Sequence, residues 1–309
     1  MKSSLKNSVL LLLTALIWGS AFVVQKDGMN YLEPFAYNTA RNLVGGLFLL
    51  VLLPALDKMR SSGGDFQKGS RRNILLGGVL CGIVLFAASS FQQFGIALQS
   101  AETNVGKAGF ITACYCAFVP LIGLMFKRKS PFLVWVGVLV AVVGFFFLCL
   151  MDGIVAGQGV GLEKCDLLLL ACSLCFAVHI LVIDHFSPLA DGVRLSCIQF
   201  FVCGIMCLVC MFIWETPRWE DFLAGAGHVL YAGIMSSGVA YTLQIVAQKG
   251  VHPAVASLLL SLESVFSVLA GYVFMPEAGL SGWELLGCLL VFGAVLLVEL
   301  APSGKKEHL

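Results

Sequence analysis

Residues 9–24 of this 309-residue chain read VLLLLTALIWGSAFVV and contain no charged side chain. Lys2 and Lys6 precede this run, as basic residues precede the apolar core of a secretory signal peptide, but such a core has only about 7–15 residues. The run is longer than that, and nine further apolar stretches follow it. We therefore expect it to be retained as the first of a series of membrane-spanning helices.

The composition of the whole chain supports this interpretation. Hydrophobic residues make up 59% of the chain, charged residues only 12%, and the mean hydropathy is +0.94. A soluble domain carries about 25% charged residues, whereas each crossing of a bilayer takes roughly 20 apolar residues as a helix. The sequence predicts an all-α polytopic membrane protein with ten transmembrane helices, near residues 8–25, 35–56, 73–98, 104–126, 131–150, 165–184, 193–214, 226–247, 253–274 and 281–300.

The distribution of Lys and Arg predicts the orientation, because short loops rich in these residues stay in the cytoplasm. With a cytoplasmic N-terminus, 14 of the 19 Lys and Arg residues fall on the inner side. We expect a multi-pass protein of the plasma or inner membrane with both termini cytoplasmic. The net charge of +1 and the lack of a basic stripe argue against a nucleic-acid partner. The five Lys and Arg residues that fall on the opposite side or at outer helix ends are Lys26, Arg41, Lys107, Lys164 and Arg218.

The two halves of the chain resemble each other weakly. Residues 104–127 align without a gap over residues 254–277, and residues 17–22 open the first half as residues 174–179 open the second. Five helices per half is an odd number, so the second half is expected to be inverted, a common transporter plan with a site near the midplane. We expect one five-helix repeat over residues 1–152 and a second over residues 160–302.

Several motifs recur in one known group of membrane proteins. They are Trp18-Gly19-Ser20, Arg41, Lys107-Ala108-Gly109-Phe110-Ile111-Thr112, Pro120, the set Ala177, His179, Ile180 and Asp184, the stretch Ser261-Leu262-Glu263-Ser264-Val265-Phe266, and Glu277. On these motifs, essentially the whole chain resembles the EamA-type ten-helix members of the drug/metabolite transporter superfamily. The resemblance implies secondary transport, often export, of amino acids, nucleotide-related compounds or other small metabolites. Many relatives carry Pro where this chain has Ser264, so the expected cause of a kink in that helix is missing.

Glu263 is the ionisable residue expected deepest in the membrane. Its helix enters near Pro253, so Glu263 lies roughly 15 Å in at 1.5 Å per residue. A lipid-facing carboxylate there would cost several kcal/mol, and the side chain is therefore expected to point inward. Two interpretations stay open: a site carboxylate for a cationic group or a coupling proton, and a structural group that hydrogen-bonds a neighbouring helix.

Six further residues are candidate substrate-binding groups at membrane depth. His179 could relay protons, because imidazole titrates near neutral pH, or could bond in its neutral form between helices. Arg41 could contact an anion in a cavity or snorkel to the outer interface. Trp18 could stack on a substrate ring or pack against neighbours. The polar groups that suit the wall of a cavity for an amphipathic molecule, or that could join helices, are Gln92, Tyr115 and Tyr241.

Other classes of protein compete with a metabolite transporter. A lipid flippase or scramblase would have the same hydropathy. An intramembrane enzyme is suggested by Gly279-Leu280-Ser281-Gly282, a GxSG sequence, but Ser281 with Glu284 also reads as a capping box at the start of the last helix. Both Cys-x-x-Cys pairs, Cys172/Cys175 and Cys207/Cys210, lie in apolar runs without a partner pair at zinc-site spacing.

No phosphate-binding loop is visible in the sequence, so ATP-driven pumping by this chain alone is not expected. We expect no enzymatic activity, no metal and no cofactor. The expected partners are a small-molecule substrate, a coupling proton or ion, membrane lipid and, as an option, a second copy of the chain in a homodimer.

Overall fold

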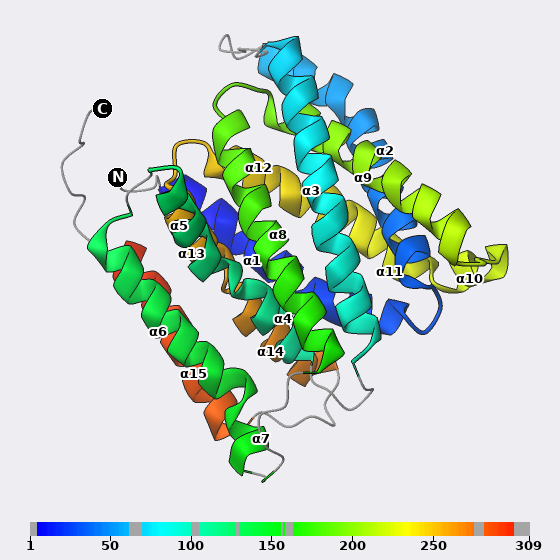
Figure 1. Cartoon of the computed structure of the whole chain (residues 1–309). Coiled ribbons are helices and arrows are strands. Elements are labelled where there is room, and N and C mark those ends of the chain that lie inside the picture. The colour runs from blue at the N-terminus through cyan, green and yellow to red at the C-terminus, as the bar shows by residue number, and fades with distance from the viewer. Residues whose placement is uncertain are drawn as a thin grey trace.

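The structure is a computed structural model that describes residues 5–61, 70–99, 105–127, 130–155, 157, 163–274 and 281–299. Figure 1 shows a bundle of helices. Its elements are α1 (Leu5–Gly28), α2 (Pro34–Ser61), α3 (Arg71–Ala97), α4 (Val105–Ala113), α5 (Tyr115–Met125), α6 (Phe132–Cys149), α7 (Met151–Val155), α8 (Lys164–Phe186), α9 (Gly192–Trp214), α10 (Trp219–Ala224), α11 (Ala226–Leu230), the π-helix η1 (Tyr231–Tyr241), α12 (Thr242–Gln248), α13 (Pro253–Leu260), α14 (Glu263–Phe274) and α15 (Gly282–Glu299). Glu277 and the basic residues Lys2, Lys68, Arg128, Lys129, Lys305 and Lys306 lie outside the described residues.

These helices confirm the prediction of an all-α polytopic membrane protein. In the described part of the chain, eight helical spans are long and apolar enough to cross a bilayer, and α6 and α15 each contain a shorter apolar helix. Together they account for the ten predicted apolar windows.

Three of the spans are not continuous α-helices. α4 and α5 form one span that is interrupted at Cys114, and α13 and α14 form another that is interrupted at Ser261 and Leu262. A third span runs through α11, η1 and α12, with its middle eleven residues in π-helical conformation. π-helical segments are rare in proteins, and those that occur often lie at functional sites.

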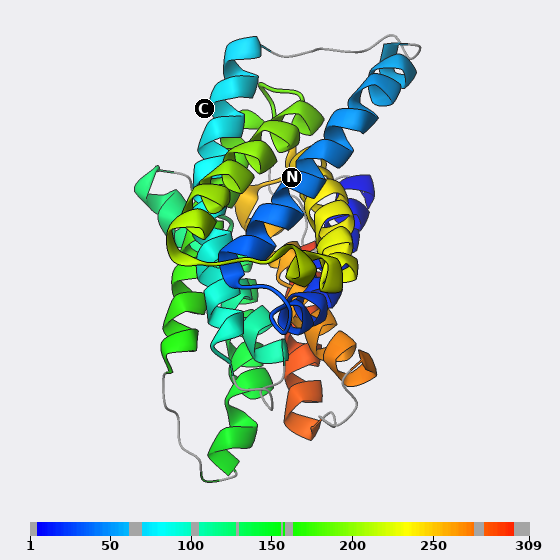
Figure 2. The same cartoon turned by 90° about the vertical axis from the view of Figure 1, so that its right-hand side faces the viewer.

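The packing divides the bundle into a large group and a peripheral pair. α3 packs along α8 and α9, and α2 packs along α9, at the upper right of Figure 1. α6 and α15 lie side by side at the lower left and touch the rest mainly through α4, α5, α13 and α14. In the turned view of Figure 2, the C-terminal part of α2 and the N-terminal part of α3 diverge at one end of the bundle.

Corresponding helices of the two halves make corresponding contacts. When α1 is matched with α8, α2 with α9 and α3 with η1, the contacts of α3 with α8 and α9 recur as contacts of η1 with α1 and α2. Likewise, α1 packs on α13 and α14 while α8 packs on α4 and α5. The boundaries of the two repeats and their inverted orientation stay predictions.

A carboxylate from the second half caps a helix of the first. Glu215, directly after α9, accepts hydrogen bonds from the backbone N–H groups of Phe35 and Ala36 at 2.7 Å each. These donors belong to the first turn of α2, where helix N–H groups lack intrahelical partners. Burial raises the pKa of the Glu215 carboxyl, against the lowering effect of the two backbone hydrogen bonds.

Candidate functional site

A cavity lies inside the bundle where α1, α2, α3, α5, α8, η1, α12 and α14 meet. Its free space is about 20 Å³, which holds about one water molecule. Six of the seven predicted site residues line this central cavity, namely Trp18, Arg41, Gln92, Tyr115, Tyr241 and Glu263. The other lining residues are Phe22, Gln25, Phe176, Ile180, Ser236 and Gln244.

Arg41 is buried in the wall of the central cavity, with 2% of the residue exposed. Its Nη1 donates a hydrogen bond to Oε1 of Gln25 at 2.8 Å, while its Nε has no hydrogen-bond partner. Among the described residues, no carboxylate forms an ion pair with this guanidinium. The geometry therefore favours contact with the cavity over snorkelling to the membrane surface.

Glu263 and Tyr115 occupy equivalent places in the two halves. Each is the first residue after the interruption of its span, and each is buried. They are 148 positions apart, as are Val105 and Pro253, the first residues of the two spans. The side chains of Tyr115 and Glu263 lie close enough to interact, although neither Oε1 of Glu263 nor the Tyr115 hydroxyl has a partner at full hydrogen-bond geometry. The two halves thus bring a carboxylate and a phenol next to each other in one cavity.

Both interruptions are tightened turns. The N–H of Cys114 donates to the carbonyl of Ile111, and the N–H of Leu262 to that of Leu259, each at 3.3 Å. These are bonds to the third residue back, the pattern of a 3₁₀ turn. In the second interruption, the Ser261 hydroxyl also donates to the carbonyl three residues back at 2.7 Å, and so does Ser264.

Serine hydroxyls that bond back to the helix backbone tend to bend it. The interruption in the span of Glu263 therefore forms with Ser264, and not a proline, one position after Glu263.

The close approach of α1 to Glu263 depends on Gly19. A Cβ atom on Gly19 would lie 2.9 Å from the Glu263 carbonyl oxygen and would collide with Phe266. Because only a residue without a side chain fits there, the Trp18-Gly19-Ser20 motif has a physical reason. It places Trp18 beside the cavity and lets α14 pack directly against α1.

Aromatic rings also line the cavity. The Trp18 ring lies 4.6 Å from the Tyr241 ring, measured between centroids, and the Trp18 Nε1–H donates to the Ser236 carbonyl oxygen at 3.4 Å. Ser236 and Tyr241 both belong to η1. The π-helical segment therefore supplies a carbonyl that fixes Trp18 and a ring that packs against it.

His179 lies in the layer behind the cavity and is not among the lining residues. Its residue is fully buried, and its Nε2 lies 3.1 Å from Oε1 of Gln199. An amide oxygen only accepts hydrogen bonds, so the proton of a neutral imidazole resides on Nε2 and Nδ1 is an acceptor without a partner. The ring of His179 meets the ring of Tyr241 edge-on at 6.0 Å. The ring thus joins α8 to α9 through Gln199.

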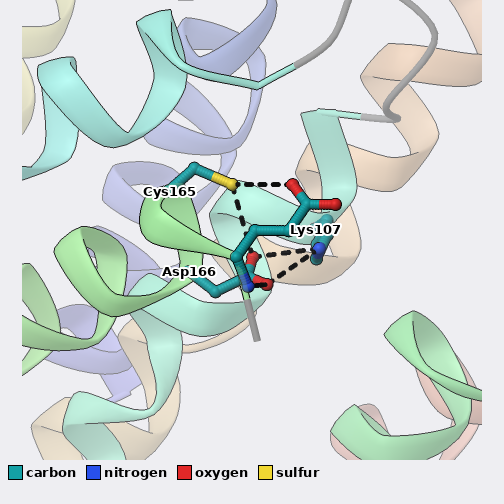
Figure 3. Close-up of polar contacts among 4 residues, drawn as sticks. Lys107, Cys165 and Asp166 are labelled. Atoms are coloured by element: carbon teal, nitrogen blue, oxygen red, sulfur yellow. Dashed lines mark hydrogen bonds and ion pairs between the residues drawn. The ribbon is translucent and has the colours of Figure 1, made fainter. Parts of the chain in front are cut away.

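Lys107 belongs to an ion pair away from the cavity. Figure 3 shows Lys107 of α4 reaching Asp166 in the first turn of α8, with Cys165 beside them. Lys107 Nζ lies 2.9 Å from Oδ1 and 3.1 Å from Oδ2 of Asp166. The backbone N–H of Glu163 also donates to Oδ2, so the same carboxylate caps α8 and holds α4. This is the end of the bundle where α4 and α8 begin.

Further ion pairs close both ends of the bundle. At the end where α1 finishes, Asp27 Oδ2 lies 2.6 Å from Nε2 of His228 in α11. At the opposite end, Asp57 of α2 pairs with Arg194 of α9. The first pair joins α1 to α11, and the second joins α2 to α9.

The structure also assigns Ser281 a role in helix capping. The Ser281 hydroxyl accepts a hydrogen bond from the Glu284 N–H at 3.0 Å, and the Glu284 carboxylate accepts one from the Ser281 N–H at 3.0 Å. This reciprocal pair is the predicted capping box of the last helix. In the described part of the chain, no group of three or more His, Cys, Asp or Glu residues could hold a metal ion.

Sequence reasoning missed Gln25 as a cavity residue. Gln25 precedes Lys26 and Asp27, and this charged pair suggested the end of a span. α1 continues to Gly28, so Gln25 faces inward with 3% of the residue exposed. The available signal was Arg41, an arginine expected at membrane depth in the following helix.

Comparisons with known proteins agree with this architecture. A sequence model of the EamA-like transporter family matches residues 5–150 and again residues 163–300. An uncharacterized transporter of Archaeoglobus fulgidus is 33% identical over 292 residues, which cover 94% of this chain and 84% of that protein.

The uncharacterized inner membrane transporter YedA of Escherichia coli is 26% identical over 294 residues, covering 92% of this chain and 88% of YedA. One solved crystal structure superposes with a TM-score of 0.69 at 18% identity, covering 96% of this chain and 98% of the other. At that identity the superposition shows a shared fold.

Proposed function

This chain belongs to the EamA-like transporter family, and we propose that it is a secondary transporter that moves a small metabolite such as an amino acid across the membrane. The observation that carries the proposal is the central cavity, which brings one guanidinium and one carboxylate together inside a bundle of apolar spans. Ionisable residues inside a membrane mark substrate and ion pathways by default, because burying them without a role is costly.

The proposed mechanism is alternating access. A cavity with room for about one water molecule cannot hold a metabolite, so the helices around it must separate during transport. The ion pairs Lys107–Asp166 and Asp27–His228 hold one end of the bundle, and Asp57–Arg194 holds the other. Opening one end while the other stays paired exposes the cavity to one side of the membrane at a time.

We propose export as the direction, the inner or plasma membrane as the location and a cytoplasmic position for both termini. Most Lys and Arg residues fall on the side of the membrane that holds the N-terminus, and this excess supports the orientation. The name of YedA, an inner membrane transporter, supports the location. We propose no enzymatic step, because the relatives are named as transporters and Ser281 serves as a helix cap.

A minimal system tests the proposal. Metabolomes of cells with and without the protein identify candidate substrates, and the purified protein in liposomes is then assayed for uptake of those substrates under ion or substrate gradients. We expect accumulation or exchange without ATP, and none in protein-free liposomes. A strict ATP requirement, or lipid scrambling without metabolite uptake, would overturn secondary transport.

A further inference from the structure

The two halves of the bundle contain corresponding helix contacts that are built differently. α3 meets α8 through glycines, since a Cβ atom on Gly77 would collide with Phe186 and one on Gly95 with Leu169. In the corresponding contact of the other half, η1 meets α1 through side-chain hydrogen bonds. The first contact is thus close-packed, and the second is held by polar groups.

Three side chains of α1 bond to η1 across this second contact. They are Thr14, to the carbonyl oxygen of Ala240 at 3.3 Å, Trp18, to the carbonyl oxygen of Ser236 at 3.4 Å, and Ser20, to the hydroxyl of Tyr231 at 2.6 Å. Tyr231 is the first residue of η1 and Ala240 is the last but one. The three bonds therefore cover the whole length of η1, and we call this contact the α1–η1 seam.

The seam can open without stranding its hydroxyl groups in the membrane. The Thr14 hydroxyl also lies 2.9 Å from the carbonyl oxygen of Leu10, and the Ser20 hydroxyl lies 2.9 Å from that of Ile17. Both alternative partners belong to α1 itself. A buried polar group without a partner is costly, so these internal bonds lower the cost of separating α1 from η1.

The backbone of η1 has an alternative register. Its hydrogen bonds run to the fifth residue, as in a π-helix, whereas those of an α-helix run to the fourth. Either pattern satisfies the backbone within the span, as lipid requires. Most π-helical segments are single turns, but η1 has eleven residues. A change of η1 to the α-helical register would turn its side chains to other faces of the span.

The seam lies between the central cavity and the outer surface of the bundle. Trp18 and Ser236, which are joined across it, both line the cavity. Leu16 of α1 and Met235 of η1 are exposed on the surface. On its other side, η1 packs on α2, because a Cβ atom on Gly233 would collide with Val44 of that helix.

We propose that the α1–η1 seam is a moving contact of the transport cycle. Its three hydrogen bonds hold η1 in the π-helical register while the cavity is closed, and their release lets η1 change to the α-helical register and widen the cavity. Thr14, Ser20 and Tyr231 act as positioning residues, since none of them lines the cavity. The proposal rests on the transport function proposed above and names the conformational device that serves it.

Hydrogen–deuterium exchange of the purified full-length protein in lipid nanodiscs tests the seam without any substrate. Thr14→Val and Tyr231→Phe each remove one bond across it. We expect either variant to speed the exchange of residues 231–241 about 2- to 12-fold, as for the loss of one neutral hydrogen bond. Residues 71–97 of the corresponding helix α3 should keep their exchange rates, whereas a general loss of stability would speed both segments.

Two matched variants control for the chemical change itself. Thr39→Val removes a buried hydroxyl that has no hydrogen-bond partner in the structure, and Tyr272→Phe removes an exposed phenol hydroxyl from α14. Neither residue belongs to the seam, so both variants should leave the exchange of residues 231–241 unchanged.

A reversible clamp tests whether the seam must move. Ser20→His combined with Tyr231→His replaces two side chains that touch, and Zn²⁺ can bridge two imidazoles. Because Zn²⁺ then binds the closed seam selectively, we expect it to slow the exchange of residues 231–241 about 5- to 150-fold. Flux in liposomes of the metabolite identified there should fall with it, and EDTA should restore both. The unchanged protein and each single variant with Zn²⁺ serve as controls.

The results decide the proposal separately from the transport function. Unchanged exchange of residues 231–241 in Thr14→Val and Tyr231→Phe, or an equal increase in α3, would overturn the proposal. So would continued flux through the double variant while Zn²⁺ slows the exchange of η1. In that case transport stands and the seam is static. Absence of flux through the unchanged protein would overturn the transport function, and the exchange rates would still show whether the seam opens.

Discussion

The two interrupted spans of this protein have the same architecture and different chemistry. The two spans begin at equivalent positions, and in each the interruption contains a backbone hydrogen bond from an N–H group to the carbonyl three residues earlier. Each span also places a buried side chain at the start of its second helical segment. In α5 that side chain is the phenol of Tyr115, and in α14 it is the carboxylate of Glu263. The tightened turn is thus shared by the two halves, whereas only the interrupted span of the second half carries an ionisable carboxylate at this position.

Removal of this charge should have the largest effect on transport. Glu263→Gln preserves shape and hydrogen-bonding atoms but cannot attract a cation, so we expect transport in liposomes to fall about 10- to 100-fold, as for a lost hydrogen bond to a charged group. Expression and thermal stability of the variant serve as the control for folding. Full activity of Glu263→Gln at all pH values would make this residue a structural bond between helices and would erase the difference between the two spans.

The equivalent change in the first half should have a smaller effect. Tyr115→Phe removes one neutral hydroxyl, which typically contributes about 0.5–1.5 kcal/mol through a hydrogen bond, so we expect transport to decrease about 2- to 12-fold. Initial rates over a range of substrate concentrations measure this decrease. A loss as large as that of Glu263→Gln would show that the two spans contribute equally, contrary to the comparison.

The smallest effect should come from the bend itself. Ser264→Ala deletes the 2.7 Å hydrogen bond to the Ser261 carbonyl but leaves the tightened backbone turn in place. We expect transport within about twofold of the unchanged protein and a loss of stability of about 1 kcal/mol, as for one neutral hydrogen bond. A thermal unfolding series with Cys116→Ala, the change at the equivalent position of α5, tests this. A collapse of transport in Ser264→Ala would mean that the serine bonds, and not the backbone, hold Glu263 in the cavity.

Hydropathy predicted the spans because lipid offers a peptide backbone no hydrogen bonds, so every crossing must be helical. The same signal does not distinguish an α-helix from a tightened turn or a π-helix, since all of these satisfy the backbone internally. The interruptions at Cys114 and at Ser261–Leu262, and the π-helix η1, were therefore invisible in the windows 104–126, 253–274 and 226–247.

For the candidate site, the sequence likewise predicts the depth of a residue but not the direction in which its side chain points. Depth in the membrane follows from counting residues, and it predicted Glu263 near the midplane and Arg41 and Tyr115 at membrane depth. Rotation about the helix axis depends on neighbouring helices, so the sequence could not place His179 behind Tyr241 or bring Gln25 onto Arg41.

The ion pairs at the two ends of the bundle bear on how evenly this protein is balanced between its states. Each pair is partly exposed, with 23% and 4% exposed for the side chains of Lys107 and Asp166 and 23% and 32% for Arg194 and Asp57. Such pairs contribute about 0.2–1 kcal/mol, so the loss of one changes a population ratio only about 1.4- to 5-fold. These ion pairs by themselves do not hold either end firmly, and added salt weakens them together. In the alternating-access cycle that we propose, these ion pairs therefore contribute little to the balance between conformers, and the occupant of the cavity supplies the bias.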